Sequence, residues 1–198
     1  PRAVSARCDL PAPPWRGAAR WGGCACAFRG AGLRNGGIAK QGTVLGGGPG
    51  RQPTPLLVFS AHLDTVFPEG PNVHVTRDGT VLKGPGIGDD CRGLAVILAV
   101  VRSMNKAKVQ TTGTITFVGT VGEEGLGDLR GVKALFHETL RGRIDRFVSV
   151  DGSGYGITPR GVGSRRYRVT FNGPGGHSSS ASATANRAPA LDSATRPL

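Results

Sequence analysis

The sequence lacks the marks of several large protein classes. No stretch approaches the ~18 consecutive apolar residues of a membrane-spanning helix, and residues 1–10 have no apolar core of a secretory signal. The four cysteines include no C-x-x-C pair, which argues against a cysteine-bound zinc or a dithiol redox site. We therefore expect a cytoplasmic protein with reduced thiols and no membrane partner.

Acidic residues are scarce, and the net charge of +12 raises the question of a nucleic-acid partner. The excess lies at the two ends: Asp9 is the single acid in residues 1–50, and Asp192 the single acid in residues 152–198. The arginines there are spread through Gly, Pro and Ala, without the aromatic or helical elements that gather cations on one face. We therefore expect no nucleic acid among the partners, and only tight, salt-dependent DNA binding would revive that alternative.

Aromatic residues are also few, at 6%, whereas 33 glycines and 14 prolines exceed ordinary usage. That excess is concentrated in residues 1–54 and in the last twenty residues, neither of which has a sustained apolar period. A chain of 198 residues suffices for one domain, or for one domain and part of a second. The organised part is predicted to lie between about residues 56 and 177.

This middle part alternates strand-like and helix-like segments. An apolar stripe from Leu94 to Met104 has helical spacing, begins at the acids Asp89 and Asp90, and ends among lysines. The predicted elements are a strand at 56–60, a hairpin with arms at 73–75 and 80–82, that helix, a strand at 114–121, a helix at 129–136 and a strand at 146–150. Such alternation predicts an α/β fold with an open, mostly parallel sheet.

Several acids and one histidine occur where these strands end or the helix begins. They are His62 and Asp64, Asp89, Glu123 and Glu124, and Asp151. Singly, each has an ordinary explanation, such as helix capping for Asp89 and Asp90 or a solvated loop for the glutamates. Together they fall at the carboxyl ends of the strands, where open α/β sheets place their ligands. Crowded carboxylates with an imidazole favour a divalent transition metal such as zinc.

Five segments that contain these residues resemble a known family. They are SAHLDTVFPEG, GPGIGDDCRGLAVILAV, FVGTVGEEGLGDLRGVKALF, VSVDGSG and FNGPGGHS. Between about residues 33 and 178 the chain is similar to the co-catalytic zinc metallopeptidases that include carboxypeptidase G, peptidase T and aminoacylase. The resemblance implies a hydrolase of a small peptide or an N-acyl amino acid. It also implies two Zn²⁺ ions per site in the family, one of which could be absent here, with Co²⁺ or Mn²⁺ as substitutes.

The same resemblance implies roles for individual residues. Four are implied as metal ligands, with Asp89 bridging both ions: His62, Asp89, Glu124 and Asp151. Asp64 would orient His62, and Glu123 would be the general base. His177 would stabilise the oxyanion in the site of a dimer partner.

The resemblance also implies a domain organisation. Residues 1–32 would be an irregular basic segment, 33–162 a partial catalytic domain, 163–178 the start of an α+β lid and dimerisation domain opened by a strand at 164–171, and 179–198 a disordered tail. A complete lid would imply a homodimer. No histidine follows His177, so the second ion would lack its imidazole. The sequence thus predicts a truncated family member, with an inactive remnant that binds one metal as the alternative.

Overall fold

The computed structural model describes residues 18–48, 50–67, 73–152, 154–165, 167 and 169–170. The chain divides into two units, Pro1–Tyr155 and Gly156–Leu198. In the second unit the described residues, all before 171, form neither helix nor strand, so the strand predicted at 164–171 is not found at those positions. Within the described parts of the chain, no helix is long and apolar enough to cross a membrane.

The first unit is built on a five-stranded sheet with the order β1-β2-β6-β3-β7. Its strands are β1 (Arg34–Ile38), β2 (Val44–Gly47), β3 (Leu57–His62), β6 (Ile115–Thr120) and β7 (Arg146–Ser149). Strands β6, β3 and β7 are parallel, and β2 runs antiparallel to its neighbours β1 and β6. The predicted α/β fold with a mostly parallel sheet is confirmed. A hairpin is present as β4 (Thr76–Asp78) and β5 (Val81–Lys83), but its first arm lies three residues later than the predicted 73–75.

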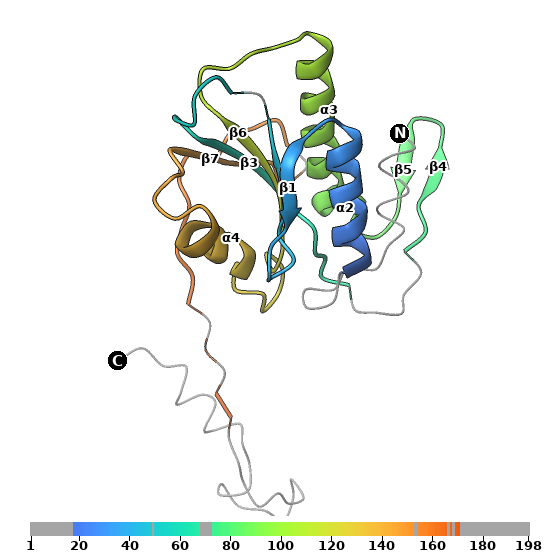
Figure 1. The fold of residues 1–198 in the computed structure, drawn as a ribbon. Helices are drawn as coiled ribbons and strands as arrows, with labels where there is room; N and C mark the ends of the chain where they lie inside the picture. Colours follow the sequence, from blue (N-terminus) through green and yellow to red (C-terminus); the bar gives the residue numbers. More distant parts are fainter. Residues whose placement is uncertain are drawn as a thin grey trace, which may run out of the picture. The chain divides into compact units, whose positions relative to one another are not determined.

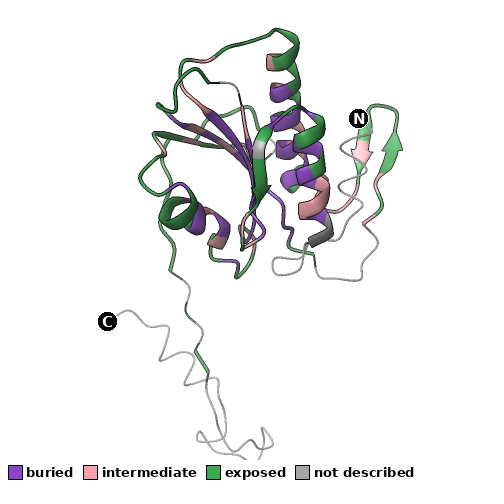
Figure 2. Ribbon diagram, in the orientation of Figure 1, coloured by how far each residue is buried: buried purple, intermediate pink, exposed green. Residues whose placement is uncertain are grey.

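Helices cover both faces of this sheet (Figure 1). On one face lie α2 (Ala18–Gly30) and α3 (Arg92–Lys106), and on the other α4 (Arg130–Ala134), followed by a π-helical turn, η2 (Leu135–Thr139). The predicted stripe on α3 packs against Phe117 of β6, whereas Val118 faces the opposite cluster with Leu135. The buried residues accordingly lie where the helices meet the sheet (Figure 2).

Two parts of the N-terminal region are more regular than the sequence predicted. Residues 18–30, expected to be irregular, form helix α2, which packs on the sheet through Cys24, Ala25, Ala27 and Phe28. Small residues make a weak apolar stripe, which explains why the pattern was missed. The glycine-rich strands β1 and β2 approach closely, because a Cβ on Gly36 would lie well under 3.0 Å from the Leu45 carbonyl oxygen.

The cysteine prediction is wrong at one position. Cys91, at the end of the π-helical turn η1 (Ile87–Cys91), is disulfide-bonded, whereas Cys26 on α2 carries a free thiol.

Candidate metal centre and active site

Strand register brings the predicted site residues to one edge of the sheet. His62 pairs with Thr120 across β3 and β6, and Ser60 pairs with Ser149 across β3 and β7. Because these strands are parallel, the residues that follow them emerge side by side. The loops with Asp64, with Glu123 and Glu124, and with Asp151 therefore meet there, and η1 adds Asp89 from the amino end of α3.

His62 lies at the centre of this cluster and is almost fully buried. Its Nδ1 is 2.9 Å from the backbone oxygen of Asp64, and since a carbonyl only accepts, Nδ1 donates. Its Nε2 lies 2.7 Å from Oδ1 of Asp89 and 4.0 Å from Oδ1 of Asp151. Two acceptors at 2.7 Å require a proton or a cation between them. Burial lowers the pKa of His62, but the surrounding carboxylates outweigh it and raise that pKa.

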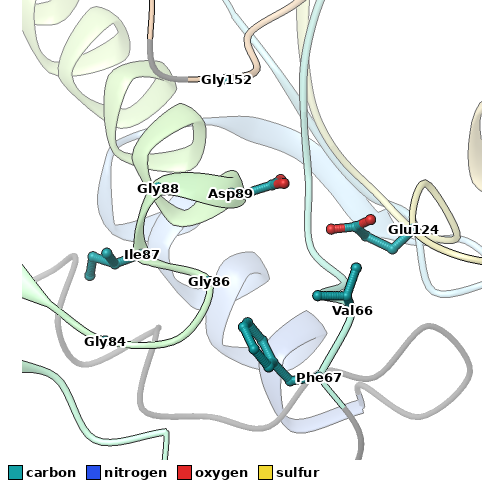
Figure 3. Close-up of a pocket in the computed structure, with 9 residues that line it drawn as sticks. All are labelled: Val66, Phe67, Gly84, Gly86, Ile87, Gly88, Asp89, Glu124 and Gly152. Carbon is teal, nitrogen blue, oxygen red and sulfur yellow. The ribbon is translucent and has the colours of Figure 1, made fainter.

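Two overlapping groups of side chains have ligand atoms within 4.8 Å of one another. One group is His62, Asp89 and Glu124, and the other is His62, Asp90 and Asp151. Imidazole and carboxylate are a donor set that suits zinc and its neighbours. Figure 3 shows the carboxylates of Asp89 and Glu124 pointing toward one another from η1 and from the loop after β6.

Asp90 is buried beneath this cluster, and the sequence did not predict a role for it. Its Oδ2 accepts the backbone N–H of His62 and its Oδ1 that of Gly93, each at 2.9 Å. Each oxygen of Asp90 thus accepts a backbone N–H, whereas Oδ1 of Asp151 lies 4.0 Å from Nε2 of His62. Burial raises the pKa of Asp90 to about 7. Capping, the ordinary explanation for the acidic pair, fits Asp90, whereas Asp89 is exposed and faces the cluster.

The carboxylate of Asp64 turns away from His62 and holds the neighbouring loop. It is buried and accepts the backbone N–H of Glu123 at 3.3 Å and that of Glu124 at 3.0 Å. His62 is oriented by the Asp64 carbonyl, and Nδ1 lies 3.9 Å from the carboxylate. The backbone oxygen of Asp64, and not its carboxylate, therefore makes the expected contact with His62. The Asp64 side chain instead connects the loops that follow β3 and β6.

Two arginines supply positive charge next to Asp64. Arg20, buried on α2, donates from Nη1 to the Leu63 carbonyl at 3.0 Å. Burial lowers the pKa of Arg20 and of Arg130, and the attraction of Asp64 opposes the shift in both. Neither arginine was predicted: Arg20 lies in a segment expected to be irregular, and Arg130, although within a segment that resembles the family, was given no role. Together they offset the charge that a buried Asp64 brings into the fold.

Glu123 is exposed at the mouth of the site and belongs to neither ligand group. Partial burial raises the pKa of Glu123, and the carboxylates of Asp151 and Asp64 add to the rise against the effect of His62. Burial likewise raises the pKa of Glu124, with Asp89 the strongest of the neighbouring carboxylates that add to it. A carboxylate with a raised pKa is a better proton acceptor near neutral pH.

A hollow of about 420 Å³ opens beside Asp89 and Glu124 (Figure 3). It is lined by Val66, Phe67, Gly84, Gly86, Ile87, Gly88, Asp89, Glu124 and Gly152. A concave site with a few converging polar groups next to a candidate metal centre has the form of a substrate pocket. His177, the last predicted site residue, lies outside the described residues.

Comparison with known proteins places this geometry in context. Residues 58–195 match the model of peptidase family M20/M25/M40. The uncharacterized protein YqjE of Bacillus subtilis (strain 168) is 32% identical over 109 residues, which cover 52% of this chain and 28% of that protein.

Solved structures share the fold. Aminopeptidase PepT from Bacillus cereus ATCC 10987 has a TM-score of 0.64 at 22% identity, with 77% of this chain and 43% of that chain covered. Human carnosine dipeptidase 1 has a TM-score of 0.59 at 16% identity, with 76% and 38% covered. The chain thus spans less than half the length of each of these relatives.

Proposed function

Because the chain belongs to peptidase family M20/M25/M40, we propose that it carries the catalytic site of a metal-dependent hydrolase that cleaves a peptide bond or the amide bond of an N-acyl amino acid. The observation that carries the proposal is the convergence of His62, Asp89 and Glu124, with ligand atoms within 4.8 Å, at the carboxyl edge of the sheet. That edge is where open α/β folds bind their substrates.

The donor set fits two divalent cations, with zinc as the first choice and cobalt or manganese as substitutes. His62, Asp89 and Asp151 would hold the first ion, and Asp89 and Glu124 the second. The 2.7 Å approach of two acceptors, Nε2 of His62 and Oδ1 of Asp89, favours a cation at this position. When bound, such ions supply an acidified water and a polarised substrate carbonyl.

The remaining residues would transfer protons, hold the loops in place and stabilise the oxyanion. Glu123 would accept a proton from the attacking water and return it to the leaving amine, for which its exposed place and raised pKa are suited. Asp64 would hold Glu123 and Glu124 in register through their N–H groups. His177 would stabilise the oxyanion, as the family resemblance implies.

A second candidate is an inactive remnant that binds a single metal. Among the described residues, His62 contributes the one imidazole to the ligand groups, which leaves the second ion with the carboxylates of Asp89 and Glu124. Two carboxylates without an imidazole are a weak set for zinc.

Metal content and turnover, measured together, separate the two. We expect two zinc ions per chain and dipeptide hydrolysis that falls at least ~100-fold in Glu123→Gln, since general-base catalysis contributes roughly 10²–10⁴-fold. The exposed Glu138 on η2 provides the matched control, and Glu138→Gln should leave turnover unchanged. One ion without turnover supports the remnant, and full turnover in Glu123→Gln refutes the assigned base.

A further inference from the structure

Two apolar side chains are exposed beside the candidate metal centre. Val66 and Phe67 follow strand β3 and its ligand His62 by four and five positions, and they are 61% and 36% exposed. Isolated exposed apolar residues are common on protein surfaces. These two line one hollow together with the carboxylates of Asp89 and Glu124, which is a more specific arrangement.

The size and lining of the hollow favour a side chain of the substrate as its occupant. Its volume of about 420 Å³ lies within the roughly 300–1,000 Å³ of small-molecule sites. In Figure 3 the two carboxylates face one another at one end, Val66 lies beneath Glu124, and the Phe67 ring is turned toward Gly86. The Ile87 side chain points away from the carboxylates, so Val66 and Phe67 supply the apolar wall.

Glycine and charge further define what the hollow accepts. Four of its nine lining residues are glycines, which contribute no side chains to the hollow. A Cβ at Gly88 would meet nothing within 4 Å, whereas one at Gly86 would lie 2.8 Å from the Thr65 side chain. Among the described residues that line the hollow, none is Lys or Arg, so the protein offers an acidic side chain no cationic side chain there.

We propose that Val66 and Phe67 form an apolar subsite for a substrate residue that flanks the scissile bond, so that aliphatic and aromatic side chains are preferred over glycine and over acidic side chains. The inference rests on the proposed hydrolase function and specifies the substrate class of that site. The preference arises because an apolar side chain covers Val66 and Phe67 and leaves water.

Dipeptide selectivity tests this subsite in the zinc-loaded chain. We would measure kcat/KM for Leu-Gly, Gly-Leu, Gly-Gly, Asp-Gly and Gly-Asp, and in parallel their binding to Glu123→Gln by calorimetry. Either leucine peptide should exceed Gly-Gly by at least ~10-fold in both readouts, since a single methylene is worth roughly 10–200-fold in an apolar pocket. Phe67→Ala should remove most of this preference and leave zinc affinity unchanged.

Controls distinguish the possible failures. Phe136 on η2 is exposed to 38%, close to the value for Phe67, and Phe136→Ala should leave selectivity intact. Equal kcat/KM for all five dipeptides overturns the subsite and leaves the hydrolase proposal standing. Zinc binding with neither hydrolysis nor dipeptide binding overturns both. If Phe67→Ala changes self-association instead of selectivity, another protein surface covers the hollow and the subsite inference is wrong.

Discussion

Replacement of Gly93 by alanine should disturb the whole candidate metal centre at once. Gly93 lies in the first turn of α3, where its N–H donates to Oδ1 of Asp90. A Cβ at this position would lie well under 3.0 Å from both that oxygen and the backbone oxygen of Val150. Asp90 also accepts the His62 N–H, and Val150 precedes Asp151, so the added methyl group would push apart three elements that bear candidate ligands.

The expected loss of stability follows from two destabilising effects and one stabilising effect. Overpacking a buried position costs about 1–3 kcal/mol, and loss of the charged hydrogen bond from Gly93 to Asp90 costs about 1.5–3 kcal/mol. Alanine is better than glycine in a helix by roughly 0.5–1 kcal/mol, which offsets part of the loss. The free energy of unfolding of Gly93→Ala should therefore fall by about 2–5 kcal/mol, a large share of the roughly 5–15 kcal/mol of a typical domain.

Denaturant unfolding of metal-free protein and zinc titration against a competing chelator measure the two consequences. Gly22 on α2 is the matched control, because a Cβ there would meet nothing within 4 Å. Gly22→Ala should stabilise the protein slightly and leave zinc affinity unchanged. If Gly93→Ala is as stable as the wild type and binds zinc equally well, the close approach of α3 to β7 is not as described.

Two further substitutions test the residues that hold the loops. Asp64→Asn keeps the shape of the side chain but presents an amide NH₂ to one of the two backbone N–H donors, so the free energy of unfolding should fall by about 1–3 kcal/mol. Asp128→Asn, at an exposed ion pair, is the control and should change the free energy of unfolding little in the same urea titration. Arg92→Met removes the hydrogen bonds to the Gly152 and Gly154 carbonyls in the loop after β7, so zinc affinity should fall about tenfold. The exposed Arg102→Met is the control, and equal zinc affinity in the two variants would contradict a role of Arg92 in holding this loop.

The sequence predicted the three parallel strands β3, β6 and β7 because each has a strong local signal, whereas the glycine-rich β1 and β2 were not predicted. Strand β6 is buried at all six positions and reads as a continuous β-branched and apolar run. Helix α3 was predicted from its apolar stripe, which needs no tertiary information. The clustering of His62, Asp89 and Glu124 could also be predicted, since the carboxyl ends of parallel strands meet at one edge whatever the details of packing.

What the sequence did not predict depends on contacts between distant segments. Helix α2 buries small residues that leave no readable period, so the approach of Arg20 to Leu63 could not be anticipated. The buried position of Asp90 depends on the N–H groups of His62 and Gly93 facing it, which an acidic pair in sequence does not reveal. The Asp64 carboxylate likewise accepts backbone N–H groups from a loop about sixty positions away in the sequence.

Two of the acidic motifs share one arrangement, in which neighbouring residues divide two tasks. In H-x-D, His62 faces the ligand cluster while the Asp64 carboxylate holds the loop after β6. In the D-D pair, Asp89 is exposed to the cluster and Asp90 is buried on backbone N–H groups. The carboxylates of Asp64 and Asp90 thus each accept two backbone N–H groups, whereas the carboxylate of Asp89 faces the His62 imidazole. The adjacent carboxylates of Asp89 and Asp90 are tolerable because only Asp89 would meet the proposed cation, while Asp90 accepts backbone N–H groups.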